Sequence, residues 1–520
     1  MDRWLGMGVA LCLLLLGCGK DPEDPPPPNF PGVSTQKGSS NLSISGTAFY
    51  EDKPFTASGF TGAQVNLPIR HAVVNLIAND GIILLSSSQT GEDGSFIFNN
   101  IDNSSRGGGV FLQIQAKNAS NSTSPAEIRS NSNALLGVSG PTLDDSLSNN
   151  FPLQVIVALS NNMGGAFNIL DNFLIGGAFI QKPGFCPLSQ TTACTVPFLT
   201  AFWEPGSSSG SFFDSGIPAV SIGGGGPAKN DTDEYDDTII LHEYGHFIAS
   251  SFSHDDSPGG SHFIGENTQD IRLSWSEGWA TFFASATLGS PIAVDTRANG
   301  VFTFNIDTNT SAFTTDELSN SSILWDTNTE TGFLPIWESF TAIPSADIAT
   351  IEPFAVLFMN QNPANKNSFQ AILTERKIEL FPDPSEVTGA ETTLIVNGSS
   401  QHHTLYTTNN SDPFDDKDII PFSANAGTTY TVNTFNLTNG ADTFITINPS
   451  GLTNDNASGF TYSMDCASLP CPENDSTTLS SSISFTPTTG GTFSVSVKRS
   501  PTAPPSTGRA GSYNIKVTSP

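Results

Sequence analysis

The stretch LHEYGHF at residues 241–247 sets the interpretation of this chain, because it places two histidines four positions apart with a glutamate between them. On an α-helix, positions i and i+4 lie about 40° apart in projection, so His242 and His246 face the same way and can bind one zinc ion. Glu243 follows the first histidine and can hold a water molecule on the open side of that ion.

The residues around this motif predict a buried helix over residues 234–251, since apolar side chains surround it on most sides. Further helices are expected at residues 165–180, 273–288 and 318–326. Negative charge is favourable at the start of a helix, and five acidic residues are expected to load the first turn of the motif helix: Asp231, Asp233, Glu234, Asp236 and Asp237.

A hydrolytic zinc site needs a third protein ligand, and the stretch SWSEGWATFFA at residues 274–284 contains the candidate, Glu277. A lone carboxylate in such an aromatic, apolar helix is costly to desolvate unless it meets a cation. Zinc would meet that need. The alternative is an ordinary glutamate at a helix N-terminus.

Together the two stretches resemble the gluzincins, the thermolysin-like and fungalysin-like metallopeptidases, whose second helix carries a glutamate ligand. The resemblance implies that His242, His246 and Glu277 bind one zinc ion per chain, with Glu243 as general base and then proton donor. Where thermolysin-like enzymes have an aspartate that orients a zinc histidine, this chain has Thr281. The orienting partner is therefore expected elsewhere, or the metal affinity is lower. The aminopeptidase motif GxMEN is absent, which argues against an exopeptidase.

Two further residues are candidates for the same reaction. His262 lies in the loop at residues 253–267 and could stabilise the oxyanion of the tetrahedral intermediate; an exposed loop histidine is the alternative, as it is for His254. The segment that ends at Asp326 resembles an ILWD helix of related bacterial proteins. Asp326 could be the missing carboxylate that orients a zinc histidine, and a surface aspartate at a helix end is the alternative.

The two flanking regions are expected to be β-rich. Residues 41–119 contain AVVNLIANDG and then TGEDGSFIF, a pattern that resembles the transthyretin-type sandwich called the carboxypeptidase regulatory-like domain. Residues 386–520 resemble the bacterial pre-peptidase C-terminal domain, a module that accompanies secreted proteases. That resemblance implies a possible structural calcium site, with surface carboxylates as the alternative, at Asp415, Asp416, Asp418 and Asp442.

The N-terminus predicts export and a lipid anchor. Residues 1–17 have the short apolar run of a signal peptide, and the small-residue site before Cys18 resembles a bacterial lipobox. The resemblance implies that Cys18 is acylated, with palmitate among its lipids, and holds the chain to a membrane; an ordinary cleavable signal peptide is the alternative. Residues 18–40 form a Pro-rich tether. Gly19 resembles the pattern of export to the outer membrane, so the outer membrane or cell surface is the expected location.

Four cysteines remain after the signal region, and their spacing predicts two local disulfides, Cys186–Cys194 and Cys466–Cys471. Zinc binding by these pairs is the alternative. It is disfavoured because no further cysteine or histidine lies near either pair.

Composition narrows the function further. The net charge is −30 and only 13% of the residues are charged, so nucleic-acid binding is excluded on electrostatic grounds. The sequence predicts a multidomain protein in which an α+β zincin-like catalytic domain, residues 120–385, lies between two all-β sandwich domains. We expect a zinc metallopeptidase, a hydrolase of protein or peptide substrates. The alternative is a catalytically inactive adhesion or binding lipoprotein on a peptidase-like scaffold.

Overall fold

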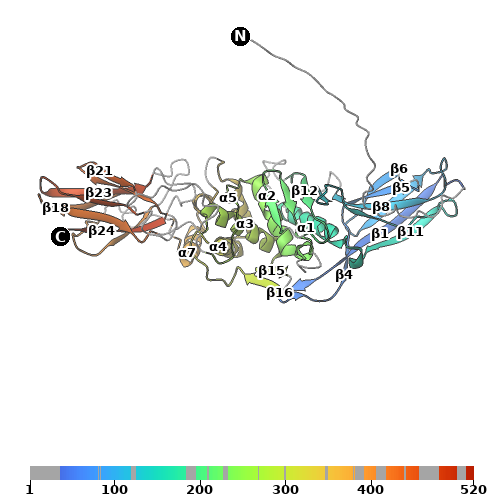
Figure 1. The fold of residues 1–520 in the computed structure, drawn as a ribbon, viewed down its shortest axis with the longest axis horizontal. Helices are drawn as coiled ribbons and strands as arrows, with labels where there is room; N and C mark the ends of the chain where they lie inside the picture. Colours follow the sequence, from blue (N-terminus) through green and yellow to red (C-terminus); the bar gives the residue numbers. More distant parts are fainter. Residues whose placement is uncertain are drawn as a thin grey trace, which may run out of the picture.

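The structure is a computed structural model. It describes residues 36–79, 81, 83–118, 124–182, 185, 195–207, 210–225, 232–266, 269–297, 300–345, 349–378, 380, 392–405, 417–437, 441–455, 480–500 and 511–520. Figure 1 shows β-rich regions at the two ends of an elongated molecule, with helices between them. The predicted multidomain architecture of an α+β unit between β structures is therefore confirmed.

The N-terminal part begins with a four-stranded sheet centred on β1. In this sheet β1 pairs with β11 in parallel and with β4 and β7 in antiparallel orientation. Its strands are β1 (Leu42–Asp52), β4 (Val65–Pro68), β7 (Ser95–Ile101) and β11 (Asn150–Val157). In β1 the side chains of Leu42, Ile44, Ala48 and Tyr50 are buried, whereas those between them are more exposed, so one face of the sheet is covered.

A second sheet of eight strands has the order β13-β14-β12-β9-β8-β5-β6, with β10 also paired to β8. Its strands are β5 (Ala72–Ala78), β6 (Leu84–Gln89), β8 (Val110–Asn118), β9 (Ala126–Arg129), β10 (Gly137–Ser139), β12 (Leu199–Phe202), β13 (Phe212–Asp214) and β14 (Ala219–Ser221). In β5 every second residue is buried, as expected for a strand with one covered face.

Both sheets include strands from either side of the predicted domain boundary at residues 119/120. Strand β8 pairs with β9 through Lys117 and Glu127, and β1 pairs with β11 over eight residues. A single hydrophobic core extends from Leu42 to Leu380 and joins these sheets to the helices. The N-terminal strands and the helical region therefore share one core, while the exact boundary stays a prediction.

Seven helices are seen among the described residues: α1 (Gly164–Ile180), α2 (Asp237–Phe252), α3 (Ile271–Leu288), α4 (Glu317–Thr331), α5 (Phe333–Thr341), α6 (Ile351–Gln361) and α7 (Lys366–Glu375). The four helices predicted from the sequence are confirmed as α1 to α4, whereas α5 to α7 were not predicted. Two single-turn 3₁₀ helices, η1 (Leu159–Asn161) and η2 (Asp233–Tyr235), precede α1 and α2.

Small residues bring the central helices into close contact. A Cβ atom at Gly245 would lie 3.0 Å from the Ala280 Cα, so α2 meets α3 almost backbone to backbone. A Cβ atom at Gly278 would lie 2.5 Å from the Asn320 Cβ and 2.9 Å from the Glu317 carbonyl oxygen, so α3 is equally close to α4. These contacts bring side chains of three helices to one place.

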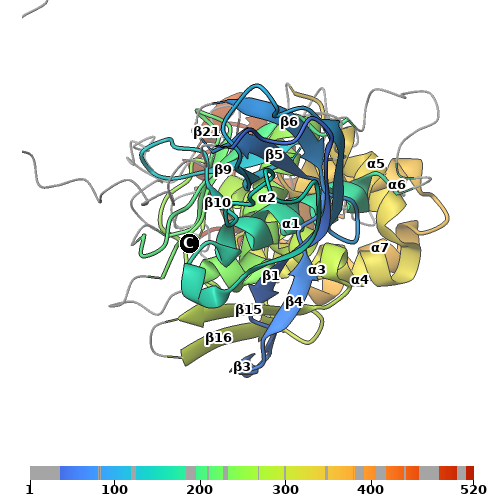
Figure 2. The same cartoon turned by 90° about the vertical axis from the view of Figure 1, so that its right-hand side faces the viewer.

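Two short hairpins lie beside this helical region. The first joins β15 (Ile292–Arg297) to β16 (Gly300–Asn305), and the second joins β2 (Phe55–Thr56) to β3 (Gly59–Phe60). Figure 2 shows β15 and β16 below the helices and next to β3, while α5 to α7 lie to one side. Strand β15 also contacts α2 and α3, so the first hairpin borders the helices that carry the two sequence motifs.

The C-terminal part consists of two four-stranded sheets with the orders β17-β24-β19-β22 and β18-β23-β20-β21. The strands are β17 (Gln401–Leu405), β18 (Asp418–Ala424), β19 (Tyr430–Phe435), β20 (Thr443–Asn448), β21 (Leu452–Asp455), β22 (Ser482–Phe485), β23 (Gly491–Arg499) and β24 (Gly511–Thr518). They enclose a core of their own, from Leu394 to Val517. The predicted C-terminal β domain thus has a separate hydrophobic core.

Several sequence predictions fall outside the described residues. These are the signal peptide, residues 18–35 of the Pro-rich tether, acylation at Cys18, both disulfides (Cys186–Cys194 and Cys466–Cys471), and two of the four candidate calcium ligands, Asp415 and Asp416. Of the other two candidates, Asp418 accepts a hydrogen bond from the Tyr513 hydroxyl, and Asp442 is buried. Within the described residues, no helix is both long enough and apolar enough to span a membrane.

Candidate metal centre and active site

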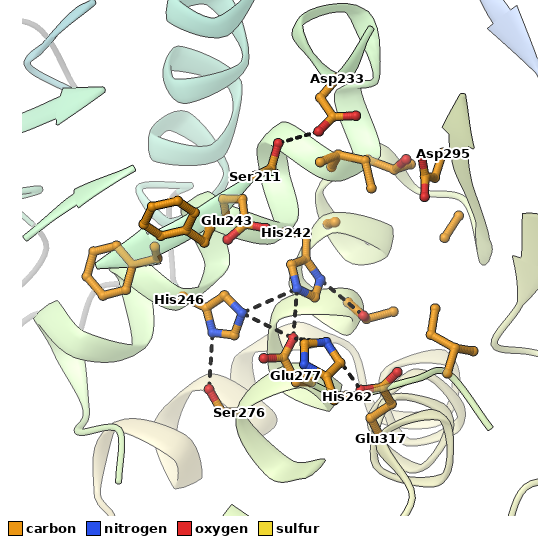
Figure 3. A pocket seen from close by; sticks show the side chains of 18 of the residues that line it. Ser211, Asp233, His242, Glu243, His246, His262, Ser276, Glu277, Asp295 and Glu317 are labelled. Atoms are coloured by element: carbon orange, nitrogen blue, oxygen red, sulfur yellow. Dashed lines mark hydrogen bonds and ion pairs between the residues drawn. The ribbon is translucent and has the colours of Figure 1, made fainter. Parts of the chain in front are cut away.

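Helices α2 and α3 bring four side chains of the two sequence motifs together at one pocket (Figure 3). His242, Glu243 and His246 come from α2, and Glu277 comes from α3. Glu243, His246 and Glu277 are each less than 9% exposed. The four-residue spacing on α2 turns both imidazoles toward Glu277, as the helical period predicts.

The donor atoms of the two histidines and Glu277 fit a zinc ion. His242 Nε2 lies 3.0 Å from Glu277 Oε2 and 3.3 Å from His246 Nε2, and the third separation, from His246 Nε2 to Glu277 Oε2, is 3.4 Å. Zinc bonds of about 2.0–2.1 Å in tetrahedral geometry would separate ligand atoms by about 3.4 Å. Two imidazole lone pairs and a carboxylate oxygen therefore converge as one zinc ion requires.

The electrostatics of these residues agree with this interpretation. Burial acts to raise the pKa of Glu277, but the charge of His246 and hydrogen bonds from both histidines outweigh it and hold that pKa well below its ordinary value. Burial acts to lower the pKa of His246, and the Glu277 carboxylate reverses the effect and raises it well above the ordinary value. The site thus holds an anionic carboxylate that attracts positive charge.

Glu243 lines the same pocket without a direct contact to the converging donor atoms. Burial raises the pKa of its carboxyl group, and the neighbouring charges of His242 and His246 only partly oppose that effect. A carboxylate with a raised pKa takes up a proton more readily than an exposed one. Its position and its basicity suit a general base.

His242 is oriented by Thr281, the residue that this chain has where thermolysin-like enzymes have an aspartate. Its Nδ1 lies 3.1 Å from Thr281 Oγ1. Because Nε2 must keep its lone pair for a metal, Nδ1 carries the proton and donates it to the hydroxyl. Of the two expected alternatives, a partner elsewhere is therefore wrong, because the threonine hydroxyl itself reaches the ring, and a lower metal affinity stays a prediction.

His246 is oriented by a residue pair that the sequence analysis missed. Its Nδ1 lies 3.1 Å from Ser276 Oγ, and that hydroxyl donates to Asp255 Oδ2 at 2.7 Å. The serine proton points to the aspartate, so the serine oxygen is free to accept the proton on His246 Nδ1. A signal for Ser276 did exist, since it directly precedes Glu277, but nothing in the sequence marked Asp255 among the acids of its loop.

We predict that S276A weakens zinc binding by about 10–100-fold, the usual effect of removing an orienting partner of a metal histidine. The substitution removes the oxygen between His246 and Asp255 and leaves both residues in place. The dissociation constant for zinc, measured by competition with a chromophoric chelator, checks this. S250A changes an exposed serine on the same helix as His246 and should bind zinc like the wild type; equal affinity of S276A and S250A would contradict the assignment.

A second pair of side chains, His262 and Glu317, also lies near Glu277. His262 Nε2 lies 3.4 Å from Glu277 Oε2 and 3.8 Å from Glu317 Oε2. Glu317 is the first residue of α4 and is 4% exposed, whereas the His262 side chain is 32% exposed. The structure thus places His262 at the pocket, where its role at the oxyanion stays a prediction, together with a buried glutamate that the sequence analysis did not single out.

Two other candidates from the sequence lie away from the donor atoms. The Asp326 carboxylate forms an ion pair with Arg376 at 3.0 Å and is not among the residues that line the pocket. The suggestion that Asp326 orients a zinc histidine is therefore wrong, because α4 directs it toward the segment after α7. His254 also lies off the pocket and pairs with Asp256 at 3.3 Å.

The pocket has a volume of about 800 Å³ and combines acidic and apolar walls. Six of its apolar residues come from β13, β15 and β16: Phe212, Phe213, Ala293, Val294, Phe302 and Phe304, and Ile239, Ile264 and Ala284 complete the apolar lining. Strand β13 ends the order of the eight-stranded sheet and, among the described strands, pairs only with β14. An unpaired sheet edge therefore borders the candidate zinc site.

The acidic residues before α2 have other roles than the one predicted. Only Asp237 lies in the first turn of α2, and it accepts hydrogen bonds from Asn168 and Asn172 of α1. Asp236 precedes the helix without capping it and accepts from the backbone and hydroxyl of Thr296 on β15. The carboxylates thus tie α2 to α1 and β15. The expected loading of the first turn is confirmed for Asp237 and wrong for Asp233, Glu234 and Asp236, and Asp231 lies outside the described residues.

We predict that D236N stabilises the protein at pH 8 more than at pH 5. Burial raises the pKa of Asp236 from 3.8 to about 7, with Asp295 and Asp237 adding to the effect. A raised folded-state pKa contributes stability at low pH that is lost as the pH rises through about 7. At about 1.4 kcal/mol per pKa unit, the loss between pH 5 and 8 is about 2–3 kcal/mol, and an amide avoids it.

Urea unfolding of both proteins at the two pH values measures this effect. E338Q changes an exposed glutamate on α5 and should follow the wild type at both pH values. A stability difference between D236N and wild type that does not grow with pH would show that Asp236 is not the group responsible.

Comparison with known families agrees with this geometry. Residues 184–326 match the Mycolysin C-terminal domain. This is a model of a zinc metallopeptidase family, and the matched range contains α2, α3 and all three candidate ligands. The predicted class of zinc metallopeptidase is thus supported for this region, and the narrower likeness to thermolysin and fungalysin stays a prediction.

Other comparisons are weaker. No curated protein matches the chain. Among solved structures, the pre-peptidase C-terminal domain of a collagenase from Bacillus anthracis is 14% identical, with a TM-score of 0.16, over 25% of this chain and 96% of that one. CorA, a surface-associated copper-binding protein of Methylomicrobium album BG8, is 12% identical, with a TM-score of 0.17, over 25% and 98%. At these values we draw no conclusion about function from either structure.

Proposed function

We propose that this chain is a zinc-dependent endopeptidase that hydrolyses peptide bonds in protein substrates. The observation that carries the proposal is the convergence of His242, His246 and Glu277, whose three donor atoms lie 3.0–3.4 Å apart at a pocket that also contains Glu243. The match of this region to a zinc metallopeptidase family supports the same conclusion.

In this proposal His242, His246 and Glu277 hold the metal, and Thr281 and Ser276 fix the two imidazole rings. A bound zinc ion supplies a Lewis acid that makes water nucleophilic at neutral pH. Glu243 accepts the proton of the attacking water and later returns it to the leaving amine. Its burial in the pocket wall supports this role, because burial raises the pKa of the Glu243 carboxyl group and makes it a stronger base than an exposed glutamate.

We assign the oxyanion of the tetrahedral intermediate to His262. The histidine lines the pocket, its Nε2 lies 3.4 Å from Glu277, and its ring is partly exposed to the space where substrate must enter. A protonated imidazole there can donate a hydrogen bond to the developing negative charge. The charges of Glu277 and Glu317 raise the pKa of His262 in spite of its burial, which favours the protonated form.

An extended peptide is the substrate that fits the walls of this pocket. The edge of β13 can accept a peptide as an added strand, and the nearby phenylalanines of β13 and β16 can contact apolar side chains. The sequence has no GxMEN motif to anchor a free amine, so we propose internal cleavage rather than removal of terminal residues. The Thr281 contact with His242 weakens the case for an inactive scaffold, because Thr281 was a main reason to consider one.

The test of this function is metal-dependent proteolysis by the purified full chain. We expect casein cleavage that stops when 1,10-phenanthroline removes the metal and returns on addition of zinc, with about one tightly bound zinc per chain. Equal cleavage before and after metal removal would overturn the proposal.

We also propose that Cys18 anchors the chain by lipid to the outer membrane or cell surface. The support is the sequence alone: an apolar signal run, a small-residue site before the cysteine, and a Pro-rich tether after it. Cells grown with labelled palmitate should label the wild-type chain and not C18S. Label on both proteins, or on neither, would contradict the anchor.

A further inference from the structure

We propose that His262, Glu277 and Glu317 form a second divalent-cation site next to the zinc site. Glu277 is common to both sites: its Oε2 is the oxygen that lies near His242 and His246 and also near His262, so this one oxygen would bridge the two ions. The proposal goes beyond the peptidase function, since the hydrolysis described above needs only the first ion.

The separations of the donor atoms suit a metal ion. His262 Nε2 lies 3.4 Å from Glu277 Oε2 and 3.8 Å from Glu317 Oε2, and donor atoms of all three residues lie within 4.8 Å of one another. Bonds of about 2.0–2.2 Å place ligand atoms about 2.8–4.4 Å apart, depending on the coordination geometry. The separations between donor atoms are larger in this second group than in the first, so we expect the second group to bind its metal ion more weakly.

Glu317 supplies a second, independent observation. Its Oε2 is buried and accepts no hydrogen bond among the described residues, although Gln269 is a side-chain hydrogen-bond partner of the carboxyl group and the carboxylate faces the pocket (Figure 3). A buried carboxylate oxygen without a partner is costly, and a cation is the ligand that such an oxygen binds best. The close contact of α3 with α4 at Gly278 fixes this oxygen beside Glu277.

The orientation of the His262 ring leaves Nε2 available to bind a metal ion. Its Nδ1 lies 3.4 Å from the Gly260 carbonyl oxygen, so a proton on Nδ1 points to that carbonyl. The lone pair of Nε2 then faces the two carboxylates. A backbone carbonyl that fixes the tautomer in this way is typical of histidines that bind metals.

The chemistry of the donors indicates which cation binds. One imidazole with two carboxylates suits zinc or manganese, whereas calcium and magnesium prefer oxygen ligands throughout. Four further carboxylates line the pocket, from Asp233, Glu243, Asp255 and Asp295, and the one arginine among the lining residues, Arg297, pairs with Asp295. The remaining negative charge favours a second cation. While that cation is bound, His262 is its ligand and does not donate to the oxyanion.

Zinc titration of the metal-free full chain by calorimetry tests the second site. The wild type should bind two equivalents, a tight one at His242, His246 and Glu277 and a weaker one. E317Q should lose the weaker equivalent and keep the tight one. E330Q, the same substitution at an exposed position near the other end of α4, should bind two equivalents.

H262A provides a second variant that does not depend on the fold around Glu317, because the histidine is partly exposed in a loop. It too should bind one equivalent. A wild type that binds one equivalent, or two equivalents in both E317Q and H262A, overturns the second site and leaves the proposed peptidase intact. A wild type that binds none overturns the peptidase as well.

Discussion

E243Q should cleave casein with a kcat/KM about 10²–10⁴-fold below that of the wild type, the usual contribution of a general base. Glutamine has nearly the same volume as glutamate and the same backbone preferences, so α2 should fold as before. Its amide cannot accept the proton that the attacking water must lose. Glu243 is also absent from both groups of converging donor atoms, so the metal content should not change.

Kinetic and metal measurements together make this prediction specific. Casein hydrolysis gives the rate, and elemental analysis of the same preparation gives the zinc content. E338Q, on the exposed surface of α5, should retain the wild-type rate. A rate for E243Q equal to that of E338Q would show that another group takes the proton.

Residues whose role depends on spacing along one helix could be predicted from the sequence. His242 and His246 are four residues apart, and this alone places them on one face of α2. Glu277 could be predicted from a different signal, because an isolated carboxylate in an aromatic helix needs a cation. Both inferences use properties of a single helix, and the structure brings the three residues together.

Residues whose role depends on contacts between elements could not be predicted in this way. Asp255 reaches His246 only through Ser276, across the space between a loop and α3. Glu317 becomes buried beside Glu277 only because Gly278 lets α3 approach α4 closely, and a sequence does not show which helices meet. The predicted helix began one residue later, at position 318, so Glu317 was placed outside it.

The acidic residues before α2 also show that contacts between elements cannot be predicted from local sequence. A helix start rich in carboxylates suggests a favourable interaction with the helix dipole. In the structure, however, Asp237 binds two asparagines of α1 and Asp236 binds Thr296 of β15. Local electrostatics predicted a plausible role, but tertiary hydrogen bonds, which are stronger when buried, determine the actual one.

E277Q should bind no zinc at either site and should show no casein cleavage. An amide oxygen is a much weaker zinc ligand than a carboxylate, and the substitution removes the negative charge that attracts the metal between His242 and His246. Because Glu277 also belongs to the second group of donors, both equivalents should be lost together. Elemental analysis after gel filtration and casein hydrolysis measure the two effects, with E330Q as the matched control.

The comparison of E277Q with E243Q then separates binding of the metal from use of the metal. E243Q should keep its zinc and lose activity, whereas E277Q should lose both, and circular dichroism should show the same helix content in each. Retention of one zinc per chain in E277Q would mean that another donor completes the site with the two histidines. Since His262 is the nearest further imidazole to Glu277 among the described residues, the double variant E277Q/H262A would then identify it or exclude it.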